Sequence, residues 1–219
     1  MPVPYRRKTR ADDPYADARY LPGEHGEEVA IESLFPGATS ATPIELEIGG
    51  GRGAFHFERL VAAPDACVLG LEIRKKWATI VDRKLHTLGV QARGRVFSED
   101  ARLALPRLRP DARLRAVFLH FPDPWWKKKH EKRLVLGDVV QDELERLLMP
   151  GGELFVQTDV AHRAEQYRAF LDGRTALTPK GDVAGDPHLR ENPYEARSPR
   201  EKRAIVDGLP IHRLRYARR

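Results

Sequence analysis

Cysteine is almost absent from the sequence, which contains only Cys67. A single thiol cannot form a disulfide within the chain or build a zinc site from cysteines, and no metal is expected. Long apolar runs are also absent, since none approaches the roughly eighteen residues of a membrane-spanning helix. The first residues, MPVPYRRKTR, carry charge without an apolar segment behind them, which is unlike a secretory signal. We therefore expect a cytoplasmic protein with no membrane association.

Apolar content and charge together indicate a folded protein with an anionic partner. The 219 residues are 41% hydrophobic, which is enough for a buried core in one domain of ordinary size. Lys and Arg number 38 against 32 Asp and Glu, a net charge of +6. Such an excess favours binding to a polyanion, because Lys and Arg neutralise phosphates and release their counterions.

Composition changes near residue 40. Residues 1–40 are rich in Pro, Gly and charge, with one short helix expected around 27–34. They are typical of an arm that can be disordered on its own and could order on a nucleic acid. Residues 41–219 are expected to form a single domain.

Strands and helices alternate from residue 44 onward. We expect strands at 44–49, 67–73, 95–98, 115–121 and 153–158, and helices at 54–63, 74–88, 134–148 and 161–171. This is the pattern of an α/β fold, with a mostly parallel twisted sheet and helices on both of its faces. Ligands of such sheets bind beyond the carboxyl ends of the strands.

The first expected strand leads into a glycine cluster, Glu47-Ile48-Gly49-Gly50-Gly51-Arg52-Gly53. Glycines let a backbone turn tightly and approach a ligand closely, and the start of the next helix offers free N–H groups. The spacing of the alternate glycines differs from that of dinucleotide-binding loops, and Glu47 would repel a pyrophosphate. A purely structural glycine turn is the alternative.

Two further carboxylates follow the next two strands. Glu72 can accept both hydroxyls of a ribose, or form an ion pair with Arg74 or Lys75. Asp100 can accept from an adenine amine, or cap the following helix. Together with Glu47 they line one edge of one sheet. This arrangement suits a ligand with a ribose, an adenine and positive charge, and S-adenosylmethionine has all three.

The most specific segment, FPDPWWKKKHEKR at 121–133, follows the fourth strand. Its two prolines fix the backbone around Asp123, which places an acid at the mouth of the cleft. Basic residues interleaved with tryptophan suit stacking on bases and contact with phosphates. The alternative is a solvated charge run whose tryptophans pack on the core.

At these motifs the sequence resembles the bacterial tRNA (guanine-N7-)-methyltransferases, over roughly residues 44–216. The resemblance rests on EIGGGRG, GLEI, the aspartate at 100, FPDPWWKKKHEKR, GGELFVQTD at 151–159 and NPYEAR at 192–197. It implies a Rossmann-like class I methyltransferase fold, and methyl transfer from S-adenosylmethionine to N7 of guanosine 46 in the tRNA variable loop. No obligate protein partner is inferred, so a monomer or a homodimer is expected.

The resemblance also implies which residues form the site. The cofactor contacts would be Glu47, Gly49, Gly51, Gly53, Glu72, Asp100 and Asp123, and the tRNA contacts would be Lys127, Asp159, Asn192 and Glu195. Three positions depart from the family pattern: Trp126 stands where the family usually has Pro, Leu134 where it has a second Arg, and Asn192 where it has Thr.

The chemistry of the reaction assigns Asp123 the catalytic role. N7 of guanine carries an in-plane lone pair, so no proton need leave before attack and no strong base is required. The enzyme has to align N7 with the methyl group, and a fixed carboxylate stabilises the positive charge that arrives on the purine. Asp159, after the next strand, is expected beside Asp123, with a helix N-cap as its alternative.

Three rival functions are weighed against this one. A nicotinamide-dependent oxidoreductase shares the fold, but the glycine spacing argues against it. A guanine-N7 methyltransferase acting on another RNA shares the chemistry. A non-catalytic RNA-binding protein with this fold is disfavoured by the intact acids at 47, 72, 100 and 123.

Overall fold

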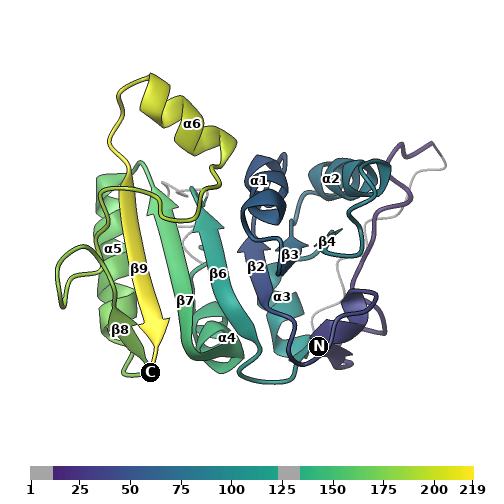
Figure 1. Cartoon of the computed structure of the whole chain (residues 1–219), viewed down its shortest axis with the longest axis horizontal. Coiled ribbons are helices and arrows are strands. Elements are labelled where there is room, and N and C mark those ends of the chain that lie inside the picture. Colours follow the sequence, from purple (N-terminus) through teal and green to yellow (C-terminus); the bar gives the residue numbers. More distant parts are fainter. Residues whose placement is uncertain (1–11, 123–133) are drawn as a thin grey trace.

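The computed structural model describes residues 12–122 and 134–219, and within them the main feature is a seven-stranded sheet (Figure 1). Its strand order is β4-β3-β2-β6-β7-β9-β8. In chain order the strands are β2 (Ile44–Ile48), β3 (Cys67–Leu71), β4 (Gly94–Phe97), β6 (Leu114–His120), β7 (Leu148–Thr158), β8 (Leu177–Pro179) and β9 (His212–Arg218). The strands from β4 to β7 run parallel, and only β9 pairs antiparallel, with β7 and β8. The expected α/β fold with a mostly parallel sheet is confirmed.

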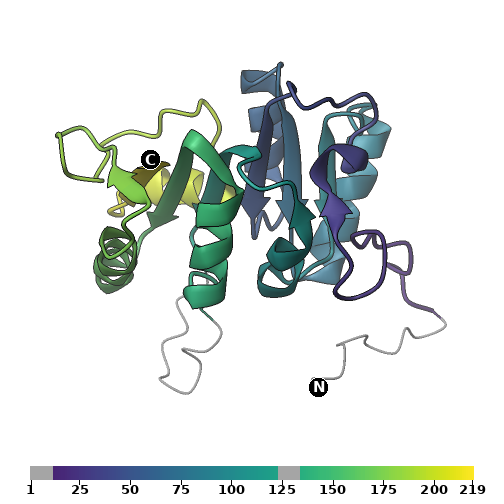
Figure 2. The ribbon, with the colours of Figure 1, turned by 90° about the horizontal axis from the view of Figure 1, so that it is seen from below.

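Helices cover both faces of the sheet (Figure 2). They are α1 (Ala54–Ala62), α2 (Lys75–Thr87), α3 (Ala101–Ala104), α4 (Asp138–Leu147), α5 (Ala161–Asp172) and α6 (Pro199–Val206). Side chains of α1 and α2 pack with Val68 and Val96 on one face, while those of α3, α4 and α5 pack with Leu46, Leu69 and Val117 on the other. Because side chains alternate along a strand, Glu45 and Glu47 point to the α1 face. The two carboxylates of β2 therefore lie on one side of the sheet.

Part of the expected N-terminal arm belongs to the core. A short strand β1 (Val29–Ala30) pairs with β5 (Leu108–Arg109), and a 3-10 helix, η1 (Ile31–Leu34), stands where a helix over 27–34 was expected. The side chains of Leu21, Val29, Ile31, Leu34 and Phe35 are buried against the α4 face of the sheet. Residues 1–11 lie outside the described residues. Leu21 and four side chains between Val29 and Phe35 thus belong to the core, whereas residues 22–28 and most of 36–40 are exposed.

Several elements differ from the sequence-based expectation. Helix α4 begins at Asp138 rather than at 134, because Gly137 takes an extended conformation at its N-cap. Strand β9 and helix α6 were not expected at all. The sequence of β9, HRLRYAR, alternates basic and apolar residues. In the fold it pairs with β7, and Leu214 and Tyr216 are buried.

We expect Ile31→Ala to lower the free energy of unfolding by about 2–5 kcal/mol, the cost of a cavity at a well-packed site. Ile31 is fully buried although it lies before the alternating strand-helix region. Urea denaturation measures the effect, with Val61→Ala, at a side chain 81% exposed, as the control. A loss at Ile31 no larger than at Val61 would show that the N-terminal segment does not stabilise the domain.

Candidate active site

The predicted site residues that the structure describes gather at the carboxyl edge of the parallel strands, toward the top of Figure 1. Glu47 and the glycine loop close β2, Glu72 follows β3, Asp100 follows β4, and Asp159 follows β7. Asn192 and Glu195 come from the segment before α6, which lies beyond the ends of β6 and β7. Asp123 and Lys127 lie outside the described residues, as do Trp125 and Trp126.

The glycine loop has the backbone that its sequence requires. Gly49, Gly51 and Gly53 all have positive φ angles, of 75°, 55° and 75°, which residues with a side chain rarely adopt. A Cβ on Gly53 would lie 2.7 Å from Val81 on α2, so this glycine also permits close helix packing. A Cβ on Gly49 would meet nothing within 4 Å. The loop therefore presents its backbone to open space at this point.

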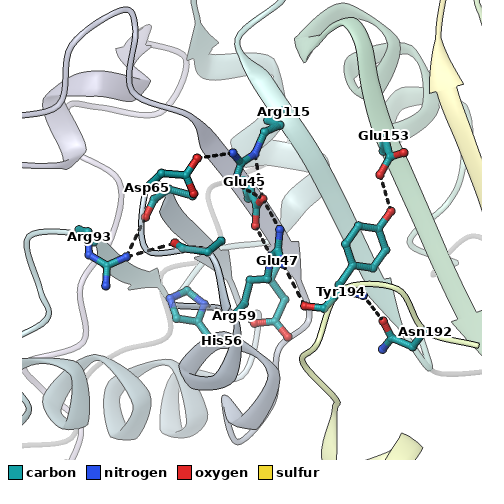
Figure 3. Close-up of polar contacts among 12 residues, drawn as sticks. Glu45, Glu47, His56, Arg59, Asp65, Arg93, Arg115, Glu153, Asn192 and Tyr194 are labelled. Atoms are coloured by element: carbon teal, nitrogen blue, oxygen red, sulfur yellow. Dashed lines mark hydrogen bonds and ion pairs between the residues drawn. The ribbon is translucent and has the colours of Figure 1, made fainter. Parts of the chain in front are cut away.

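Glu47 is a buried carboxylate with little to compensate its charge. Its residue is only 2% exposed, and a Cβ on Gly50 would lie 2.7 Å from its Oε2. Within the described chain no donor reaches it with hydrogen-bond geometry; Nδ1 of His56 lies 3.3 Å from Oε2 (Figure 3). His56 is itself fully buried, and neither ring nitrogen makes a hydrogen bond. Both side chains line a small pocket with Gly51 and Glu72.

Glu72 is engaged on both oxygens. Oε2 accepts from the N–H of Gly51 at 2.8 Å, which ties the second strand end to the glycine loop. Oε1 accepts from the backbone N–H of Arg74 at 2.8 Å and from its Nε at 3.0 Å. The ion pair with Arg74, weighed as the alternative to a ribose contact, is thus present. A carboxylate offers about four lone-pair positions, so these three bonds leave capacity for a further donor.

Asp100 takes the capping role that was weighed against an adenine contact. It is the N-cap of α3 and accepts from the N–H of Arg102 at 3.0 Å, and the Arg102 guanidinium pairs with it as well. The neighbouring Glu99 accepts from the N–H of Leu21 at 3.0 Å. Burial raises the pKa of the Glu99 carboxyl above its usual value. The N-terminal segment thus packs directly beside this strand end.

The ends of β6 and β7 carry a second buried histidine. Nδ1 of His120 lies 2.9 Å from Oε1 of Gln157, and its ring packs against Phe55. Burial lowers the pKa of His120, so the neutral form is favoured. The next residue, Phe121, has a positive φ of 46°. The backbone is therefore in an unfavourable conformation two residues before Asp123.

Asp159 does not cap α5, whose N-cap is Val160 without a side-chain hydrogen bond. Its carboxylate instead pairs with Arg200 on α6. In the segment before α6, Asn192 uses its amide for local contacts: Nδ2 donates to the carbonyl of Ala196 and to Glu201 on α6, and Oδ1 accepts from the N–H of Tyr194. Both Nδ2 hydrogens are used, so only the oxygen is left for a substrate.

Sequence reasoning missed two residues of this site, His56 and Arg59, both on α1. Arg59 pairs with Glu45 and donates to the carbonyl of Tyr194 (Figure 3). The expected helix at 54–63 includes both residues, but nothing in the sequence indicates that they contact Glu45, Glu47 or Tyr194. Among residues 12–122 and 134–219, no cluster of His, Cys, Asp and Glu fits a metal ion. No helix in those ranges has the length and apolar content to cross a membrane.

Comparison with solved structures supports the fold alone. The 16S rRNA methyltransferase KamB superposes with a TM-score of 0.56 at 13% identity, covering 85% of this chain and 90% of that one. TrmN from Thermus thermophilus superposes with a TM-score of 0.57 at 16% identity, covering 81% of this chain and 44% of that one. Both superpositions support the expected α/β fold class.

Comparison with known sequences identifies the family. A family model described as "Putative methyltransferase" matches residues 41–214. The tRNA (guanine-N(7)-)-methyltransferase of Myxococcus xanthus is 35% identical over 173 residues, 79% of this chain and 82% of its own. The enzyme of the same name from Anaeromyxobacter dehalogenans is 37% identical over 176 residues, 80% of this chain and 85% of its own. The chain therefore belongs to the bacterial tRNA (guanine-N7-)-methyltransferase family.

Proposed function

We propose that the chain transfers the methyl group of S-adenosylmethionine to N7 of guanosine 46 in the variable loop of tRNA. Family membership supports the reaction class and the RNA substrate. The observation that carries the proposal at the level of this chain is the buried carboxylate of Glu47 beside the glycine loop; among the described residues its one ionic neighbour is Nδ1 of His56 at 3.3 Å. The protein is expected to act in the cytoplasm, alone or as a homodimer.

The described residues fit this cofactor. A buried carboxylate without a hydrogen-bond donor is costly in a protein, and a ligand that carries positive charge would offset the cost. Glu47 would face the amino acid part of S-adenosylmethionine, Glu72 the ribose hydroxyls and Asp100 the adenine amine. The open side of Gly49 permits the close backbone approach that such a ligand needs. A pyrophosphate, by contrast, would be repelled by Glu47.

Binding and orientation are the tasks left to the chain. S-adenosylmethionine supplies an electrophilic methyl group on a sulfonium, so the protein need not generate a nucleophile. We infer that Asp123 stands at the reaction centre, accepts from guanine N–H groups and stabilises the charge that arrives on the purine. Asp159 would bind the base beside it, Glu195 would contact the substrate from the loop before α6, and Lys127 and Asn192 complete the tRNA side.

Methyl transfer to unmodified tRNA transcripts with guanosine or adenosine at position 46 tests the proposal directly. We expect label from S-adenosylmethionine to appear as 7-methylguanosine only in the guanosine transcript. Label in both transcripts would place the modified nucleotide elsewhere. Cofactor binding without any transfer would favour a non-catalytic RNA-binding protein or another RNA substrate.

Glu47→Gln is expected to weaken S-adenosylmethionine binding by about tenfold or more, because a hydrogen bond to a charged group is lost. The same change removes a buried carboxylate charge, so the melting temperature of the ligand-free protein should stay level or rise. Calorimetric titration and thermal unfolding measure the two effects. The control is Asp65→Asn, at an exposed carboxylate between α1 and β3 that pairs with Arg115. Wild-type affinity in Glu47→Gln would remove this residue from the cofactor site.

Asp123→Asn is expected to keep the fold and cofactor binding while turnover falls by about a hundredfold or more, as when one fixed electrostatic contact to a transition state is removed. Single-turnover methyl transfer measures the loss. Asp138→Asn, which changes an exposed carboxylate at the start of α4, is the matched control and should leave turnover unchanged. Near-normal turnover in Asp123→Asn would contradict the catalytic assignment.

A further inference from the structure

Arg59 connects the helix that follows the glycine loop to the loop before α6. Its Nε and Nη2 donate to the two oxygens of Glu45 at 2.7 and 2.8 Å, and its Nη1 donates to the backbone carbonyl of Tyr194 at 2.9 Å (Figure 3). The Glu45 side chain is fully buried and that of Arg59 is 13% exposed. The guanidinium also lies 5.5 Å from the centre of the Tyr194 ring and 5.7 Å from that of Phe118. This cation is thus bonded to one carboxylate and one carbonyl and lies near two aromatic rings.

The carbonyl that Arg59 binds belongs to the peptide group on which the φ angle of Glu195 depends. Glu195 has a φ of 56°, in the left-handed region that costs an ordinary residue stability. It is exposed, whereas Tyr194 and Ala196 on either side are buried among Phe55, Phe118 and Phe155. The Tyr194 hydroxyl donates to Glu153 on β7 at 2.7 Å. Anchors on both sides therefore turn Glu195 outward.

We propose that Arg59 is a positioning residue for tRNA methylation: by holding the Tyr194 carbonyl, it keeps Glu195 in the strained conformation that presents its carboxylate to the substrate. The inference rests on the proposed function in one respect, the substrate contact of Glu195. Arg59 touches neither substrate nor cofactor in this scheme. It acts through the loop, and Glu45 holds it in place.

The chain offers a matched control for this contact. Arg115 on β6 binds the same Glu45 oxygen, Oε1, at 2.8 Å, and its second partner is Asp65 at 2.6 Å. Its hydrogen bonds within the described residues go to Glu45 and Asp65, and none of them goes to Tyr194. Lysine at either position can keep an ion pair with Glu45. At both positions lysine loses the fork of the guanidinium, but only at position 59 does the lost donor bind the Tyr194 carbonyl; at position 115 it binds Asp65.

The test compares Arg59→Lys with Arg115→Lys. We expect Arg59→Lys to lower kcat/KM for tRNA by about tenfold, the size of effect of one lost hydrogen bond in a positioned site. Its dissociation constant for S-adenosylmethionine should stay within about twofold of wild type, since the cofactor contacts are untouched. Arg115→Lys should match it in melting temperature but keep wild-type kcat/KM. Equal kcat/KM in the two variants would overturn the proposal.

A readout without catalysis separates this inference from the proposed function. Amide hydrogen exchange of the peptide spanning 192–197 should be faster in Arg59→Lys and unchanged in Arg115→Lys. If wild-type protein transfers no methyl group to tRNA but the exchange difference is present, the proposed function fails and the positioning contact stands. If tRNA is methylated and exchange is the same in both variants, the positioning contact fails alone.

A double-mutant cycle tests whether Arg59 acts through Glu195. In a Glu195→Gln background, the additional loss from Arg59→Lys should largely disappear, and full additivity would overturn the proposed route. Should Arg59→Lys not fold, the neutral pair Glu45→Gln with Arg59→Gln removes both buried charges together, and Glu45→Gln alone is its control. Wild-type kcat/KM in the neutral pair would equally overturn the inference.

Discussion

The burial of two carboxylates on one face of β2 is the constraint that organises the site. A buried carboxylate is tolerated when cations or hydrogen-bond donors surround it. Glu45 meets that condition with two arginines, Arg59 and Arg115. Glu47, two residues further along the same strand, has among the described residues only the His56 ring as an ionic neighbour, and that ring makes no hydrogen bond to it. The first carboxylate is thus satisfied by the fold itself, and the second fits a cationic ligand.

Helix α1 lies between the two groups of proposed site residues. It begins directly after the glycine loop, beside the proposed cofactor residues, and Arg59, which pairs with Glu45, also binds the loop that carries the proposed substrate residues. Glu58 adds a second contact to that loop by accepting from the N–H of Arg197 at 2.9 Å. One helix therefore contacts both groups of proposed residues, which links their positions.

Local patterns predicted the elements that local physics determines. The glycines at 49, 51 and 53 predicted a turn, and short apolar runs predicted β2, β3 and β6. What could not be predicted depends on partners far along the chain. The pairing of β9 with β7, the burial of Ile31, and the contact of Arg59 with Tyr194 join segments whose sequences carry no sign of each other. Arginine and histidine within an amphipathic helix are ordinarily solvent-facing, so a buried role for His56 and Arg59 had no local signal.

The two sides of the site are built from different kinds of backbone. The proposed cofactor residues stand at strand ends, where paired strands and positive-φ glycines hold them without strain. On the substrate side, Phe121 and Glu195 have positive φ angles although neither is a glycine. Phe121 lies two residues before Asp123, and Glu195 is itself a proposed substrate residue. Such conformations persist only where surrounding contacts hold them. The Phe121 N–H donates to the Gln157 carbonyl at 2.8 Å, and Arg59 holds the peptide before Glu195. Contacts with the sheet and with α1 thus stabilise the backbone of the substrate side. Substitutions at these contacts would disturb the proposed substrate residues before the proposed cofactor residues.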